Sequence, residues 1–103
     1  MAKGAYTNGE KDGIWTYWYE NGQKWKEGTY KDGKEYGLAT GWYENGQKSR
    51  EIIIKDGKPD GLGTMWYENG QKKEEVTFKD GELISQNCWD KNGNEKECEY
   101  PPN

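Results

Sequence analysis

The chain has 103 residues, enough for one domain, and Leu, Ile, Val and Phe number only ten of them, below the roughly 20% that marks an aliphatic core. Six Trp and eight Tyr can replace that core, because each aromatic ring buries roughly 150 to 250 Å². A net charge of −4 with interspersed signs makes nucleic acid a poor candidate partner, and no apolar stretch approaches the roughly 20 residues of a transmembrane segment.

One block of seven residues, Trp-Tyr-Glu-Asn-Gly-Gln-Lys, occurs three times without change, at 18–24, 42–48 and 66–72. A Lys-Asp-Gly marker keeps the same 24-residue period, at 31–33, 55–57 and 79–81. Degenerate copies stand before the first block and after the third, at 6–9 and 88–93. Such self-similarity is typical of stacked repeats. We predict that residues 1–103 form a single domain of three full repeats with an atypical unit at each end.

Each repeat contains two turn signals, Glu-Asn-Gly and Lys-Asp-Gly, and the segments between them are rich in Trp, Tyr, Thr and Ile. In chain order the expected strands centre on 14–18, 28–30, 38–42, 52–54, 62–66 and 76–78. Helix is not expected, since fifteen glycines are spread along the chain and no apolar series has a 3.6-residue period. We therefore predict an all-β fold, an elongated single antiparallel sheet made as a meander of stacked β-hairpins, with about nine strands.

Alternation along each strand assigns its side chains to two faces. Ile14, Thr16 and Trp18 share one face with the matching residues of the next two repeats, and we expect this face to form the core. The opposite face carries small residues that would permit tight curvature, namely Ala39, Gly41 and Gly63.

Two turn geometries give different registers. A two-residue Asn-Gly turn would place Leu38 opposite Ile53. A three-residue loop, with Gly46 in the left-handed conformation and a bulge, would place Leu38 opposite Ile52 and would place Leu62 opposite Val76. The second register pairs apolar residues twice, so we predict it.

The Trp-Tyr-Glu-Asn-Gly-Gln-Lys block followed by Lys-Asp-Gly-Lys resembles the MORN repeat variant, as found in bacterial proteins of the YwqK antitoxin family. The likeness spans roughly Tyr6 to Cys98. It implies an elongated antiparallel sheet of stacked hairpins that binds other proteins and, in some bacterial members, neutralises a toxin encoded nearby. The family shares no catalytic residues that could be carried over to this chain.

The residue types oppose catalysis and metal binding. The chain contains no histidine, the commonest general base and the commonest metal ligand. Neighbouring carboxylates, such as Asp56 with Asp60, are better explained as solvated turn charges. The segment 90–94 lacks the spacing of a calcium loop, because Gly93 stands fourth rather than sixth. We expect no enzyme activity, no cofactor and no metal site.

Cys88 and Cys98 would lie opposite each other across a loop centred on Gly93. A disulfide between them is possible, and two reduced thiols are the alternative, which a cytosolic protein favours. Residues 1–4 lead into no hydrophobic signal segment. We expect a cytoplasmic protein by default, or a surface or periplasmic protein if a signal peptide has been removed.

Three aromatic residues of the first repeat, Trp15, Tyr17 and Trp25, lie on the face away from the expected core, where the other repeats carry mostly small or polar residues. The predicted register puts Tyr17 opposite Trp25, so the two can form an aromatic patch extended by Tyr19, and such patches are favoured binding sites. The alternative is that the N-terminal arm, residues 3–6, folds over them as a cap.

A second candidate feature is the ladder of Tyr19, Tyr43 and Tyr67, one repeat apart, which could bind a partner or simply pack beside the turns. The partner-binding candidates are therefore Trp15, Tyr17, Tyr19, Trp25, Tyr43 and Tyr67. The leading hypothesis is a non-enzymatic protein-binding module, with a toxin-neutralising antitoxin or immunity protein as its specific form. The acidic net charge would suit a basic partner.

Two other functions stay open. The segment 39–43, Ala-Thr-Gly-Trp-Tyr, is similar to the Gly-Trp repeats of cell-surface modules that bind choline or glycans by stacking on aromatic rings. A purely structural role is the third, in which sheet edges pair between copies of the chain.

Overall fold

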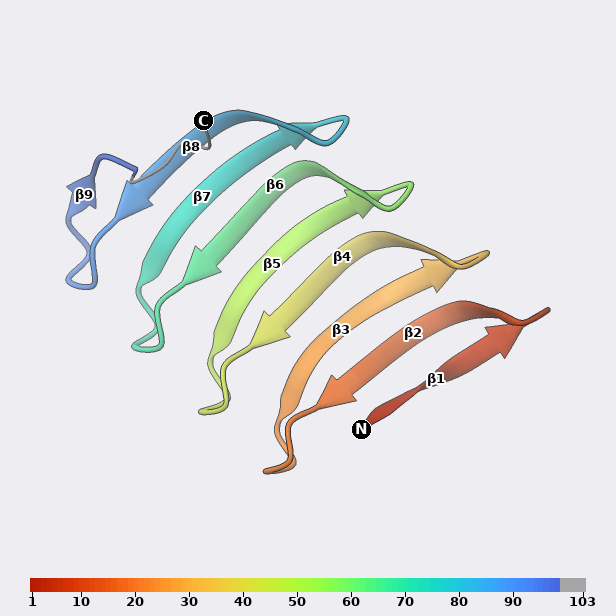
Figure 1. Cartoon of the computed structure of the whole chain (residues 1–103). Coiled ribbons are helices and arrows are strands. Elements are labelled where there is room, and N and C mark those ends of the chain that lie inside the picture. Colours follow the sequence, from red (N-terminus) through yellow and green to blue (C-terminus); the bar gives the residue numbers. More distant parts are fainter. Residues whose placement is uncertain (99–103) are drawn as a thin grey trace.

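The computed structural model describes residues 1–98, which form one open antiparallel sheet of nine strands (Figure 1). Strands that follow each other in the chain lie side by side in the sheet, so the chain is a meander of hairpins measuring 47 × 35 × 18 Å. The predicted all-β fold is confirmed. The strands are β1 (Ala2–Thr7), β2 (Glu10–Trp18), β3 (Lys24–Lys31), β4 (Lys34–Trp42), β5 (Lys48–Lys55), β6 (Lys58–Trp66), β7 (Lys72–Lys79), β8 (Glu82–Trp89) and β9 (Glu95–Lys96).

Two kinds of turn join these strands. Asp32 and Gly33 have φ angles of 52° and 80°, the geometry of a two-residue type I′ turn, and the other Asx-Gly turns on this edge match it. The opposite edge has three-residue loops, in which Tyr43 N donates to Gln47 O and Gly46 has a φ of 90°. The three-residue loop with a left-handed glycine is therefore confirmed. No helix in the part of the chain that the structure describes could span a membrane.

The register predicted beyond this loop is wrong. A second bulge, between Gly41 and Trp42, offsets the pairing by one residue, so Leu38 lies opposite Ile53 rather than Ile52. The third repeat has the same offset, with Leu62 opposite Thr77 rather than Val76. The prediction included the bulge at the loop but not the second bulge beside Trp42. Together the two bulges give the same strand register as a two-residue turn.

On β2, β4 and β6 the buried face is the opposite of the one predicted. Trp15 is 7% exposed and belongs to the face expected to be open. Ile54 and Val76, which the predicted register placed with the core residues, are at most 9% exposed and lie on the same face as Trp15. The aliphatic residues expected in the core of these strands are exposed instead, Ile14 to 63%, Leu38 to 52% and Leu62 to 54%, whereas Thr16 is 9% exposed. A single curved sheet shields from water only the inside of its curve, which we call the concave face, and its outer side is the convex face.

The curvature comes from irregular pairing in the middle of the strands. Gly37 has a φ of 76°, and the pairing of β3 with β4 shifts beside it, between Glu27 and Thr29. Gly13 and Gly61 occupy the same position in the other repeats and also have positive φ. Figure 1 shows β2 to β8 arching in the same sense.

Large and small residues pair across the concave face. Trp15 lies opposite Gly28 and Ala39 opposite Ile52, and Gly63 lies opposite Val76 in the third repeat. A Cβ on Gly63 would come within 3.0 Å of Val76, so these pairs leave little spare space. The small residues therefore make room for the large ones opposite them.

The C-terminal end is closed by β9 and a disulfide between Cys88 and Cys98, whose Cα atoms are 5.3 Å apart. Of the two alternatives, the disulfide is therefore the one present, but the two cysteines are not directly opposite, because Cys88 pairs with Lys96. The intervening segment is a hairpin turn, as expected, since Asp90 N donates to Asn94 O.

Candidate functional site

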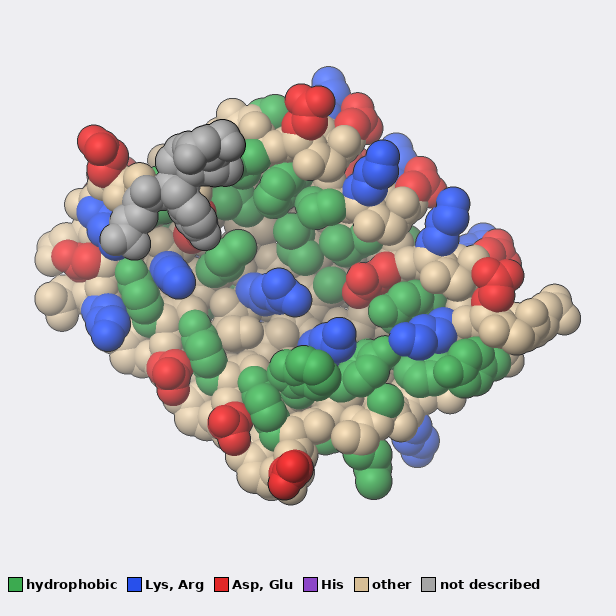
Figure 2. All heavy atoms as spheres, in the orientation of Figure 1, with side chains coloured by type: hydrophobic (Ala, Val, Ile, Leu, Met, Phe, Trp, Pro, Cys, Tyr) green, Lys and Arg blue, Asp and Glu red, His purple; other side chains and the backbone are tan. Residues whose placement is uncertain are grey.

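A cluster of rings and lysines covers the concave face over β1 to β3. We call it the aromatic patch, and its members are Tyr6, Lys11, Trp15, Tyr17, Trp25, Lys26 and Tyr30. Figure 2 shows hydrophobic side chains gathered across this hollowed face, with Lys and Arg side chains among them. Neighbouring strands bring the patch together, since Tyr17 pairs with Lys26 across β2 and β3.

Trp15 is the structural part of the patch. Its indole Nε1 donates to Ala5 O at 2.9 Å, and the ring of Tyr6 meets it edge-on with 4.9 Å between ring centroids. Gly4 lies so close that a Cβ there would clash with the indole ring. Residues 3–6 thus cover Trp15, though as part of an edge strand paired with β2 and not as a folded-over arm. With 7% of its surface exposed, Trp15 offers little to a partner.

Trp25 and Tyr17 form the open part of the patch. Trp25 is 45% exposed, and its ring meets that of Tyr17 edge-on, with centroids 6.0 Å apart. Trp25 stands in a bulge and not directly opposite Tyr17 as predicted, because Tyr17 pairs with Lys26. The ring of Tyr19 lies 6.3 Å from Trp25 at the margin of the patch.

Two lysines give the patch a positive charge. Lys11 Nζ donates to the hydroxyl of Tyr17 at 2.6 Å, and this hydrogen bond raises the pKa of Lys11. Lys26 Nζ lies 4.7 Å from the ring centre of Tyr17 and 4.9 Å from that of Trp25. The two contacts of Lys26 are cation–π interactions, which hold its ammonium group against the ring faces. Burial, with the nearby charge of Glu35, raises the pKa of Tyr30, so its phenol stays neutral.

Beside the patch the concave face holds a hollow of about 220 Å³. Small and aliphatic residues line it, among them Gly28, Ala39 and Ile52. Its charged lining residues are the cations Lys26 and Arg50 and the acids Glu27 and Glu35. The hollow therefore offers an apolar surface with two cations at its side and the Glu35 carboxylate over Gly28.

The tyrosine ladder holds the hairpins together. Tyr43 Oη donates to Trp66 O at 2.5 Å, one repeat further along, and burial raises the pKa of Tyr43. Tyr19 and Tyr67 make the same bond to the next repeat, to Trp42 O at 2.6 Å and to Trp89 O at 2.9 Å. Packing beside the turns is thus the interpretation that these contacts favour, and Tyr43 and Tyr67 lie apart from the aromatic patch.

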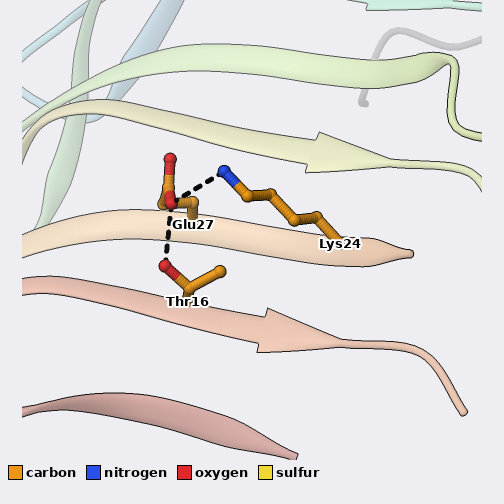
Figure 3. Close-up of polar contacts among 3 residues, drawn as sticks. All are labelled: Thr16, Lys24 and Glu27. Atoms are coloured by element: carbon orange, nitrogen blue, oxygen red, sulfur yellow. Dashed lines mark hydrogen bonds and ion pairs between the residues drawn. The ribbon is translucent and has the colours of Figure 1, made fainter. Parts of the chain in front are cut away.

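The other identical residues of the repeat also have structural roles. Asn45 Nδ2 donates to Glu68 O at 3.1 Å, while its Oδ1 accepts from Gln47 N at 2.9 Å. On the convex face the Glu27 carboxylate accepts from Lys24 at 3.3 Å and from Thr16 at 2.7 Å (Figure 3). The tryptophans of the block line up on this face too, each opposite the block lysine, at positions 18, 42 and 66.

The concave positions, in contrast, carry a different residue in every repeat. Read in repeat order they are Trp15, Ala39 and Gly63; Tyr17, Gly41 and Met65; Lys26, Arg50 and Glu74; Gly28, Ile52 and Val76; Tyr30, Ile54 and Phe78. Sequence reasoning noticed the aromatic members of this series but missed Lys11, Lys26, Tyr30 and Arg50. The same comparison between repeats would have found them.

One cluster of possible metal ligands lies elsewhere among residues 1–98, formed by Glu74, Cys88 and Cys98, with ligand atoms within 4.8 Å of one another. Both sulfurs belong to the disulfide and are not thiolates, the form that binds metals. Glu74 accepts a hydrogen bond from Gln86. The cluster is therefore a disulfide beside a bonded carboxylate.

Comparison with known proteins agrees with the repeat geometry. The MORN repeat variant matches residues 11–32, 35–56 and 59–80, which make up more than half of the chain. No curated protein and no solved structure matches the chain. On the strength of these three matches, the chain belongs to the MORN repeat variant family.

Proposed function

We propose that this chain is a non-enzymatic protein-binding module that binds its partner with the concave face. MORN repeats are consistent with a repeat protein of this kind. One observation carries the proposal: the positions that join the hairpins are identical in the three repeats, whereas the concave positions differ in each. Convex positions such as Ile14 and Thr29 also differ between repeats, but the variation is greatest on the concave face. Such variation is what a surface shaped for a particular partner requires.

The open part of the aromatic patch supplies the contact energy. Trp25 is 45% exposed beside Tyr17, and tryptophan and tyrosine are the residue types most enriched among binding hot spots. The hairpins hold the patch on paired strands, so little ordering is needed when a partner binds.

Two titratable groups of the patch have pKa values shifted away from those of a general acid or base. A general acid or base works best with a pKa near the working pH. The pKa values of Lys11 and Tyr30 are both raised, which moves them further from neutrality.

Toxin neutralisation is the specific form that we propose, and it would be steric, with the rigid sheet covering the partner's active site. The disulfide between Cys88 and Cys98 supports an oxidising compartment, such as the cell surface or periplasm, over the cytoplasm expected by default.

The test is a pulldown from the native host, followed by co-expression of the chain with the product of the neighbouring gene. Trp25→Ser is the matched variant, because Ser49 occupies the same position in the second repeat. We expect the chain to capture a partner and protect cells from it, and Trp25→Ser to lose both properties. Leu38→Ser, which alters the exposed convex face, should retain them. Equal capture by both variants would contradict binding through the patch.

Choline binding is less well supported than protein binding. The ammonium groups of Lys11 and Lys26 already lie against the rings of Tyr17 and its neighbours, and they would repel a quaternary amine. Self-association stays a prediction for light scattering, since β1 has a neighbour on one side only.

A further inference from the structure

We propose that the concave face recognises an acidic peptide segment of its partner, with one carboxylate held between Lys26 and Arg50 above Gly41. This inference rests on the proposed function and names the chemistry of the partner. It assigns a binding slot to three residues that lie side by side on β3, β4 and β5.

The slot is formed by strand pairing. Lys26 pairs with Gly41, and Gly41 pairs with Arg50, so the two cations lie on alternate strands, about 10 Å apart at the backbone. Gly41 has no side chain to fill the space between them. The Arg50 side chain leans over it, since its Cγ and Nε lie 3.4 and 3.6 Å from where a Cβ of Gly41 would be. In the third repeat Met65 fills this position.

The charges of the slot have no acidic partner in the described part of the chain. On the convex face each block lysine pairs with the glutamate three residues later, at 3.3, 2.5 and 2.6 Å. Neither Lys26 nor Arg50 has such an ion pair within residues 1–98. In the third repeat the same position is Glu74, which has the opposite charge and is bonded to Gln86. The first two repeats therefore leave two cations without an ion pair beside the hollow, with Lys26 against the rings of Tyr17 and Trp25 and Glu35 also lining the hollow.

These features fit a carboxylate with an apolar neighbour. The planar fork of Arg50 matches the two oxygens of a carboxylate, and Lys26 adds a point charge. The adjoining hollow, lined by Ala39 and Ile52, can receive an aliphatic side chain of the same segment. A phosphate dianion carries about twice the charge of a carboxylate and is therefore repelled more strongly by the net charge of −4. The charge of the slot is thus positive, although the net charge of the chain is negative.

Binding can be measured by NMR with two short peptides, acetyl-Ala-Leu-Glu-Leu-Ala-amide and its Gln counterpart. We expect the Glu peptide to shift the Gly41 amide and the Trp25 indole N–H saturably, with a dissociation constant in the millimolar range, about −4 kcal/mol. Salt should weaken the binding by screening. The Gln peptide should bind at least about fivefold more weakly, which corresponds to about 1 kcal/mol.

Three variants borrowed from the third repeat test the slot, Lys26→Glu, Arg50→Glu and Gly41→Met. Each should abolish the saturable shifts while the spectrum of the fold is retained, because the sister repeat already carries the introduced residue. Lys34→Glu changes the net charge equally at a distant turn and should bind normally. The inference would be overturned by equal binding of both peptides, by unchanged binding to Arg50→Glu, by no saturation up to about 10 mM peptide, or by tighter binding of inorganic phosphate.

The two proposals can fail separately. If Trp25→Ser loses the natural partner but Arg50→Glu keeps it, the concave face is the binding face and the carboxylate slot is wrong. If neither variant affects capture of the partner, the proposed function itself is wrong.

Discussion

The two faces of the sheet follow different rules. On the convex face every repeat has the same threonine, tryptophan, lysine and glutamate, for example Thr40, Trp42, Lys48 and Glu51. On the concave face the positions of Trp15, Tyr17, Lys26, Gly28 and Tyr30 each carry a different residue in the next two repeats. The convex face and the turns supply the bonds that any hairpin of the stack needs, so they can be copied unchanged. The concave face has only to stay packed, which leaves its residues free to specify a partner.

The largest expected loss of stability is at Trp15, a concave residue that has a structural role and so departs from the rule for its face. Trp15→Ala should lower the free energy of unfolding by about 3 kcal/mol, the lower end of the range for a buried tryptophan. The lower end applies because Trp15 packs against β1, an edge strand that can detach while the other hairpins stay folded. Urea unfolding measures the loss, and hydrogen exchange at residues 2–7 should show where it falls.

Trp25→Ser is the control within the same patch. Since Trp25 is 45% exposed, we expect a change within about 0.5 kcal/mol. Equal effects of the two variants would mean that the patch does not divide into a structural and an open part.

The C-terminal end should show the next largest effect. Removing the disulfide between Cys88 and Cys98 should lower the free energy of unfolding by about 2 to 3 kcal/mol, because the cross-link restricts a ten-residue loop in the unfolded chain. The double variant Cys88→Ser with Cys98→Ser reports this loss in a melting experiment. Reducing agent should destabilise the parent chain but leave the double variant unchanged. A parent chain insensitive to reduction would contradict a stabilising role for the bond.

The strands and turns could be predicted because they depend on local signals. Glycine at a fixed position, as in Gly46, sets the loop type from its own conformational preference. The buried face could not be predicted in this way, since alternation defines two faces but does not say which way the sheet bends. That direction is set by bulges such as the one beside Gly37, which have no counterpart in a strict period of two.

The candidate site was predicted in part for the same reason. Aromatic residues out of step with the period, Tyr17 and Trp25, attracted attention in the sequence and do meet in the fold. The cations Lys26 and Arg50 did not attract attention in the sequence, because both look like ordinary surface charges until strand pairing places them around Gly41.

A smaller effect tests the bonds that join the repeats. Tyr43→Phe removes the hydroxyl that donates to Trp66 O and should lower the free energy of unfolding by about 1 kcal/mol. Tyr36→Phe is the matched control, because Tyr36 is 45% exposed and its hydroxyl makes no hydrogen bond to the described residues, and it should be nearly neutral. If the two variants unfold alike, the ladder does not stabilise the stack.

The smallest effect is a loss of stability at alkaline pH. The pKa of Lys11 is raised by its bond to Tyr17, so this contribution is fully present below the ordinary value of 10.5 and is lost as the pH rises through the higher folded value. Burial raises the pKa of Tyr43 above 10.0, so the folded state resists its ionisation, and stability falls as the pH rises above 10.0. Both act in the same direction, and urea titrations between about pH 8 and 11 should show a falling midpoint whose slope is reduced in Tyr43→Phe. Tyr43 joins the repeats and Lys11 belongs to the aromatic patch, so combining Lys11→Met with Tyr43→Phe separates the two contributions. A urea midpoint that rises with pH would contradict both.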